Sequence, residues 1–131
     1  TEQLYLNKLD DGKEYTIAVD RLRQKLSRKK PDLIDIQEDI VKFLAENSGI
    51  EPHRLQRLLK LSEEEFLKLP PVIVIWHKDD KWTLIDGNHQ YVAAFMGGIK
   101  QIRVLSASRQ EWTPFLVKGY TPVYKGYSGI P

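Results

Sequence analysis

The sequence contains no cysteine. Disulfide bonds, thiolate metal ligands and cysteine nucleophiles are therefore excluded together, and nothing indicates an oxidising compartment. No apolar run approaches the ~20 residues that a membrane-spanning helix needs. The first residues, 1–11, also lack the apolar core of a signal peptide. These absences predict a cytoplasmic protein that makes no membrane contact.

The sequence also lacks a large excess of either positive or negative charge. The 131 residues carry a net charge of +2, with 41% hydrophobic and 29% charged residues. This composition is ordinary for one globular domain with its own core. Such a mild net charge does not by itself indicate nucleic-acid binding, so the local distribution of charge has to be considered.

The segment 21–30 is basic throughout and contains no acidic residue. Its cations are Arg21, Arg23, Lys25, Arg28, Lys29 and Lys30. One interpretation is a solvated linker or helix face. The other is an anion-binding patch for nucleic acid or polyphosphate, with Arg21, Arg23, Arg28, Lys29 and Lys30 as the candidate contacts.

Apolar periodicity and turn residues predict alternating strands and helices along the chain. Ser62 and Glu65 match a capping box at the start of one short helix. Strands are expected at Tyr15–Val19, Val72–Trp76, Trp82–Ile85 and Gln101–Leu105, and helices at Leu33–Glu46, from Pro52, from Ser62 and at Gln90–Met96.

This order of elements predicts an α/β (α+β) fold with a small mixed sheet and N-terminal helices, in a single domain over residues 14–112. An N-terminal extension, 1–13, precedes it, and an arm rich in Pro, Tyr and Gly, 113–131, follows it. The arm contains two related segments, 118–121 and 125–128. We expect it to pack on the domain or on a protein partner, and a nucleic-acid-binding arm is the alternative.

The turn from Asp86 to Gln90 combines features that favour an anion. Gly87 permits backbone conformations that other residues reach only at a cost, and it leaves room for a ligand. The helix that follows begins with unpaired N–H groups at the positive end of its dipole. Asn88 and His89 add donors, and His89 titrates near neutral pH. Asp86 repels an anion, which suggests a metal contact, a general base or a partner for a hydroxyl. The alternative is an ordinary turn in which Asp86 caps the helix.

Residues 71–104 show a longer pattern around this turn. An apolar strand and a hairpin lead into the motif, which is followed by Tyr91-Val92-Ala93-Ala94 and a helix ended by glycines. This pattern resembles the ParB/sulfiredoxin-like superfamily, whose members typically carry an Asp-Gly-x-His-Arg-like, Gly-Cys-His-Arg or Gly-Glu-Arg-Arg motif at the corner. The resemblance spans about residues 14 to 106.

The resemblance implies that the corner holds the phosphates of a nucleotide. Members of this superfamily include CTP-binding partition proteins, sulfiredoxins, free-serine kinases and proteins labelled nucleases. By resemblance, Gly87, Asn88 and His89 line the phosphate, with Gln90 beside them. Asp86 would organise Mg²⁺ or substrate, and Asp86 and His89 would be the catalytic pair.

Two departures from the family pattern change these expectations. The sulfiredoxin cysteine is replaced by Asn88, so sulfinic-acid repair, which needs a thiolate, is excluded. The family arginine is replaced by Gln90, which loses a fixed charge and a bidentate fork. Either another cation supplies that charge, with Arg103, Arg109 and the segment 21–30 as the sources, or the site is degenerate.

Three functional hypotheses follow from the sequence. The first is binding of a nucleotide or other phosphate compound at Asp86–Gln90 with Mg²⁺, extended to phosphoryl transfer or hydrolysis as an NTPase, kinase or nuclease of ParB-like type. The second is a DNA-binding module or ParB-like nuclease that acts through Arg21–Lys30. The third is a catalytically inactive interaction protein of viral or mobile-element type.

Overall fold

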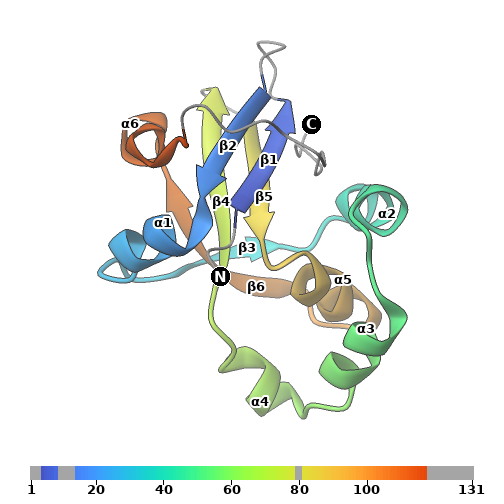
Figure 1. The fold of residues 1–131 in the computed structure, drawn as a ribbon. Coiled ribbons are helices and arrows are strands. Elements are labelled where there is room, and N and C mark those ends of the chain that lie inside the picture. The colour runs from blue at the N-terminus through green and yellow to red at the C-terminus, as the bar shows by residue number, and fades with distance from the viewer. Residues whose placement is uncertain (1–3, 9–13, 79–80, 118–131) are drawn as a thin grey trace.

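A computed structural model of the chain describes residues 4–8, 14–78 and 81–117 (Figure 1). Helices and strands are mixed along the chain, which confirms the predicted α+β fold class. The elements are β1 (Leu4–Lys8), β2 (Glu14–Ala18), α1 (Val19–Leu26), β3 (Asp32–Asp35), α2 (Glu38–Asn47), α3 (Pro52–Leu59), α4 (Glu63–Leu67), β4 (Val72–Lys78), β5 (Lys81–Asp86), α5 (Asn88–Met96), β6 (Gln101–Ala107), α6 (Arg109–Trp112) and the 3₁₀ helix η1 (Thr113–Phe115).

The main sheet has four strands in the order β3-β6-β4-β5. The pair β4 and β6 is parallel, whereas β3 with β6 and β4 with β5 are antiparallel, so the sheet is mixed as predicted. A separate two-stranded sheet joins β1 to β2. Strand β1 lies inside the segment 1–13 that the sequence suggests as an extension, and it pairs with β2 along its length.

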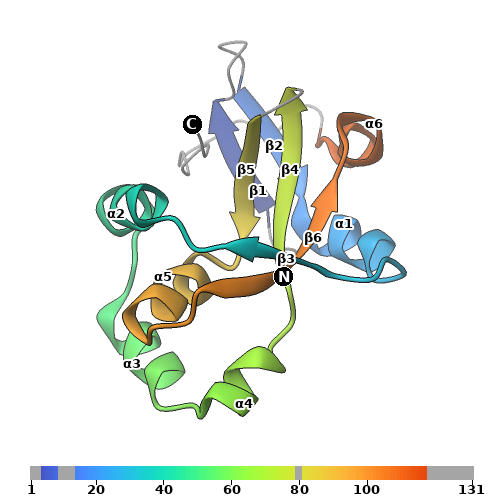
Figure 2. The ribbon, with the colours of Figure 1, turned by 180° about the vertical axis from the view of Figure 1, so that it is seen from behind.

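Strict alternation along β4 divides the core between the two faces of the sheet. Val72 and Val74 point into a first core cluster with residues of α2 and α5, and Ile73 and Ile75 point into a second with residues of α1 and α6. Figures 1 and 2 show helices on both sides of the sheet. The strand β4 is therefore buried on both faces, which explains its unbroken apolar run.

Several local expectations are confirmed. The predicted hairpin forms between β4 and β5, and Trp76 lies directly opposite Trp82. The capping box at α4 is complete, because the Ser62 hydroxyl accepts from the Glu65 N–H and the Glu65 carboxylate accepts from the Ser62 N–H. Both features depend on residues close in sequence, which is why the pattern reveals them.

The predicted helix over Leu33–Glu46 is wrong in its first part. Leu33 and Ile34 belong to β3, which pairs antiparallel with β6, and the helix begins only at Glu38. Leu33 is 59% exposed, so its match to the helical period did not reflect burial. The backbone of this segment bonds to a strand far away in sequence, and such a partner overrides local periodicity.

Two further boundaries differ from the sequence-based prediction. Val19, expected at the end of a strand, instead begins α1, so the basic segment lies on a helix over most of its length. Helix α5 starts at Asn88, two residues before the predicted Gln90, with Gly87 as its N-cap. The corner is therefore tighter than expected, because β5 ends at Asp86 and only Gly87 separates it from the helix.

Candidate functional site

Gly87 makes the direct connection between β5 and α5 possible. Its φ of +100° lies in the left-handed region, which is unfavourable for residues that carry a Cβ. A Cβ at this position would also lie 2.4 Å from Val72 Cγ1, a buried side chain of β4. Glycine is therefore required by both backbone conformation and packing, and the half-exposed first turn of α5 is held close to the sheet.

Asp86 forms an ion pair with Arg23 of α1. The Arg23 Nη2 and Nε groups donate to Asp86 Oδ2 at 2.8 and 3.2 Å, and the two side chains are 27% and 24% exposed. Arg23 comes from the basic segment, 63 positions earlier in the chain. The pair therefore brings a guanidinium close to the start of α5.

His89 is held by the start of α3. Its Nε2 accepts a hydrogen bond from the backbone N–H of Glu51 at 2.9 Å. This nitrogen is therefore unprotonated, and the ring proton of the neutral tautomer lies on Nδ1. Burial is the largest cause that lowers the pKa of His89 below its ordinary value. The nearby Arg54 cation and His53 also lower this pKa, whereas the Glu51 carboxylate raises it. Only Nδ1–H remains as a donor for a ligand.

The depressed pKa of His89 predicts a pH-dependent stability. Neutral His89 contributes to the free energy of unfolding. This contribution is complete above about pH 6.5 and is lost as the pH falls through the pKa of His89 in the folded protein, because the unfolded chain binds the proton more readily. Between about pH 7.5 and about pH 5, the free energy of unfolding should therefore fall more steeply in wild type than in His89→Gln. Urea titrations at both pH values measure this, and parallel losses in the two chains would contradict it.

Gln90 and Asn88 differ in how far their side chains are engaged. Gln90 Nε2 donates to the Pro70 carbonyl at 3.1 Å, which ties α5 to the segment before β4. Asn88 Oδ1 is buried and has no hydrogen-bond partner within residues 4–8, 14–78 and 81–117. A buried acceptor normally has a hydrogen-bond partner. The Asn88 side-chain oxygen is therefore a candidate acceptor for a hydroxyl or N–H group of a ligand.

Tyr91 fixes the first turn of α5 in the fold. It is fully buried, and its hydroxyl accepts from the Gln37 N–H at 2.9 Å and donates to the Asp35 carbonyl at 3.2 Å. Burial raises the pKa of Tyr91, although the hydrogen bond from Gln37 opposes that shift. The N–H groups of residues 88–90 are thus presented from a rigid support.

Asp86 is the metal ligand that the sequence suggests. In the described part of the chain, no group of three or more His, Asp or Glu side chains is arranged to hold a metal ion. Mg²⁺ commonly binds to one or two carboxylates together with ligand phosphates and water. A single carboxylate at the corner fits that mode, and only when a phosphate ligand shares the ion.

The basic segment is divided by the fold. Arg23 pairs with Asp86, and Lys29 Nζ donates to Glu111 Oε1 at 2.7 Å and to the Ser106 carbonyl at 3.0 Å. Hydrogen bonding to Lys29 is the largest cause of the lowered pKa of Glu111. Lys30 is exposed. The remaining members, Arg21 and Arg28, line a cavity with Lys25.

Arg103 and Arg109, the other two cations that the sequence suggests for the corner, contact other parts of the domain. Arg103 Nη1 donates to the Leu67 and Leu69 carbonyls, each at 3.2 Å. The Arg109 guanidinium lies 5.6 Å from the centre of the Trp112 ring. Among the described contacts of the cations that the sequence suggests for the corner, the ion pair of Arg23 with Asp86 is the one that reaches the corner.

The start of the predicted C-terminal arm packs on the domain. Leu116 forms an isolated bridge with Ile17, and the Val117 N–H donates to the Thr16 carbonyl at 2.8 Å. Phe115 packs against the second core cluster. The two related Lys-Gly-Tyr segments lie in 118–131, outside the described residues.

The fold and the corner together define a small mixed α+β domain with a strand–turn–helix corner. Comparisons with protein-family models, with curated proteins and with solved structures find no match to this chain. The resemblance to the ParB/sulfiredoxin-like superfamily therefore stays a prediction. Among the described residues, no helix is long and apolar enough to cross a bilayer.

Proposed function

We propose that this domain binds a phosphate-bearing ligand of the nucleotide class at the corner formed by Asp86–Gln90. The observation that carries the proposal is the position of Arg23, whose guanidinium reaches the start of α5 through Asp86. A helix N-terminus beside a guanidinium combines backbone donors with a fixed positive charge, which suits phosphate. Arg23 would thus take the role of the arginine that the resemblance to the ParB/sulfiredoxin-like superfamily leads one to expect at position 90.

The backbone, rather than the side chains, supplies most of this proposed site. His89 Nε2 and the Gln90 amide nitrogen already have protein partners. The N–H groups of the first turn lack partners inside their own helix, as in every α-helix. The buried Asn88 Oδ1 suits a sugar hydroxyl next to the phosphate. Because Asp86 and His89 each hold an intramolecular contact, the proposal is one of binding and assigns no catalytic step.

Calorimetric titration with CTP, ATP and ADP, each with Mg²⁺, tests the proposal. Wild type should release or absorb heat with at least one of them. Arg23→Gln should weaken that binding by about tenfold or more, because a charge-assisted hydrogen bond contributes about 1.5–3 kcal/mol. Lys68→Gln is the matched control, since it removes one positive charge from an exposed position directly after α4.

Asp86→Asn separates the two roles of the carboxylate. With inorganic phosphate and no metal, the variant should bind at least as tightly as wild type, because a negative charge beside the anion is removed. If Asp86 and the nucleotide phosphates hold Mg²⁺ together, Asp86→Asn should bind the nucleotide with Mg²⁺ more weakly than wild type does. Absence of heat with every ligand, or equal losses in Arg23→Gln and Lys68→Gln, would contradict the proposed function.

A further inference from the structure

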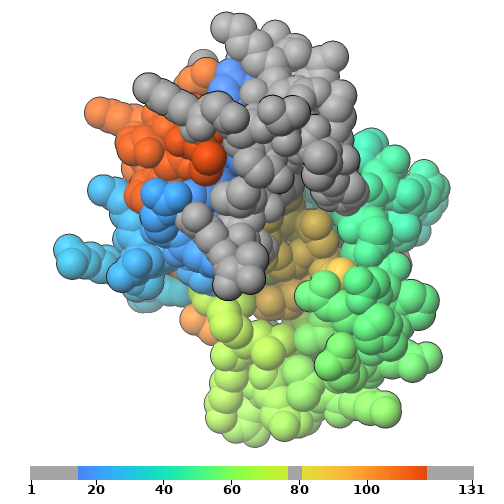
Figure 3. Space-filling model, in the orientation of Figure 1, coloured from blue at the N-terminus to red at the C-terminus, as the bar shows by residue number. Residues whose placement is uncertain are grey.

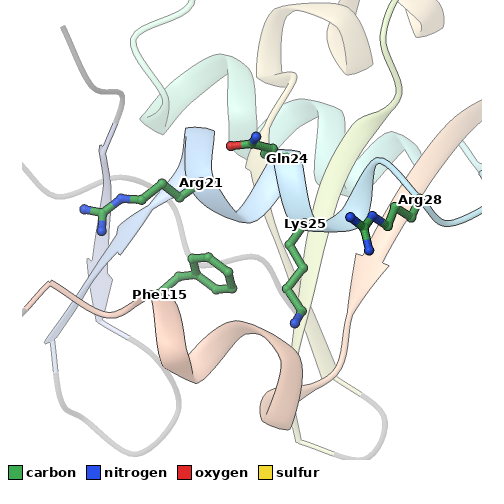
Figure 4. A pocket seen from close by; sticks show the side chains of 5 residues that line it. All are labelled: Arg21, Gln24, Lys25, Arg28 and Phe115. Atoms are coloured by element: carbon green, nitrogen blue, oxygen red, sulfur yellow. The ribbon is translucent and has the colours of Figure 1, made fainter.

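A second basic site lies on the opposite side of α1 from Arg23. A cavity of about 610 Å³ opens between α1 and η1, and Figure 4 shows the side chains that line it. In the space-filling view, the surfaces of α1 and of the segment that contains α6 and η1 lie next to each other (Figure 3). The lining residues are Arg21, Gln24, Lys25, Arg28 and Phe115.

Two of the three cations of this cavity, Arg21 and Lys25, lie on one side of α1, and Arg28 lies in the turn that follows the helix. Leu22 and Leu26 are buried in the second core cluster, which turns positions 21 and 25 outward. With a rise of about 1.5 Å per residue, these two positions are separated by about 6 Å along the helix, and Arg28 extends the series beyond its end. Among the described residues that line the cavity, none is a carboxylate. The cavity therefore presents positive charge over a length that exceeds one phosphate group.

Phe115 gives the cavity an aromatic surface. It belongs to η1 and packs partly against the second core cluster, so its ring has a fixed support. Figure 4 shows the ring below α1, with the side chains of Arg21 and Lys25 on either side of it. Aromatic rings on which bases stack, beside cations that follow the backbone, are the two elements of single-strand recognition.

We infer that this cavity binds single-stranded nucleic acid, with successive phosphates on Arg21, Lys25 and Arg28 and a base against Phe115. The site is separate from the corner at Asp86, because Arg23 leaves α1 on another side. The cavity volume lies in the ordinary range for a ligand site, about 300–1,000 Å³. Within the predicted basic patch, the structure thus favours Arg21 and Arg28, adds Lys25 and Phe115, and leaves Lys29 to its contact with Glu111.

Fluorescence anisotropy with a labelled oligothymidylate of about ten nucleotides tests this inference. Wild type should bind at low ionic strength, and log K against log salt should have a slope of about −2, because each neutralised phosphate of a single strand contributes about −0.7. An unlabelled duplex of the same length, or a mononucleotide, should compete poorly. A duplex that competes better than the single strand, or a mononucleotide that competes as well, would overturn the inference.

Two variants and a matched control locate the site. Lys25→Glu with Arg28→Glu should weaken binding at least tenfold. Lys42→Glu with Lys60→Glu changes the net charge equally, at exposed positions in α2 and directly after α3, and should change binding less than about threefold. Phe115→Leu keeps an apolar side chain and should weaken binding about fivefold or more, because stacking is lost. Circular dichroism verifies that each variant folds. Equal losses in the two charge-reversed pairs, or no binding by wild type, would overturn the inference.

Discussion

Gly87→Ala should lower the free energy of unfolding by about 2–5 kcal/mol. A left-handed conformation costs a residue with a Cβ about 1–2 kcal/mol. Overpacking a buried site adds about 1–3 kcal/mol, and the new Cβ would lie 2.4 Å from Val72 Cγ1 and 2.9 Å from Val72 Cβ. Val72 is a fully buried residue of a central strand, so it has little room to move.

Gly98→Ala is the matched control for this prediction. Gly98 also has a positive φ, +77°, but within the described part of the chain no atom other than those of its sequence neighbours lies within 4 Å of the position that its Cβ would take. Its substitution should therefore cost only the backbone term, about 1–2 kcal/mol. Urea denaturation followed by circular dichroism compares the two variants. Equal losses would show that packing against Val72 contributes nothing to the requirement for glycine at the corner.

Trp112→Ala should lower the free energy of unfolding by about 3–5 kcal/mol, as for other large buried aromatic residues. Trp112 is fully buried in the second core cluster. Its indole N–H donates to the Trp76 carbonyl at 2.8 Å, and the Tyr15 ring meets it edge to face at 5.7 Å between ring centres. Removal leaves a large cavity and an unpaired carbonyl on β4.

The control for this prediction is Phe95→Ala, because Phe95 is an aromatic residue that is 41% exposed. Its loss should cost less than about 1.5 kcal/mol, since less apolar area returns to water. Thermal unfolding followed by circular dichroism avoids the change in fluorescence that the loss of a tryptophan causes. A loss at Trp112 no larger than that at Phe95 would contradict the role of α6 in closing the second core cluster.

The sequence predicts features of the fold that depend on residues close together in the chain, and it does not predict features that depend on residues far apart. The capping box at Ser62 and the hairpin with Trp76 opposite Trp82 come from residues close in sequence, and both are confirmed. The segment around Leu33 was assigned to a helix because its partner, β6, cannot be identified from local periodicity. Local chemistry determines caps and turns, whereas pairing between distant strands depends on the whole chain.

The same distinction applies to the candidate site. The turn around Gly87 was found from the order of strand, glycine and helix, and its left-handed glycine follows from that order. The pair between Arg23 and Asp86 joins positions that no sequence pattern relates. The basic segment indicates that cations are available, but only the fold separates Arg23, which reaches the corner, from Lys25, which lines the cavity between α1 and η1.

Phe115 belongs to the C-terminal arm, 113–131, for which the sequence predicts packing on the domain or on a protein partner. It packs against the second core cluster, which contains Ile17 of β2 and Trp112 of α6. The composition of the segment indicates an arm, but the surface that receives Phe115 is assembled from distant parts of the chain and cannot be identified from the sequence.

The most direct test of the phosphate-binding corner is the response of individual backbone amides to a nucleotide. In ¹H–¹⁵N spectra recorded while CTP and Mg²⁺ are added, the account predicts that the largest shifts occur at the amides of Asn88, His89 and Gln90 and at the Arg23 side-chain Nε–H. Shifts that are absent, or that appear only around Lys25 and Phe115, would contradict it.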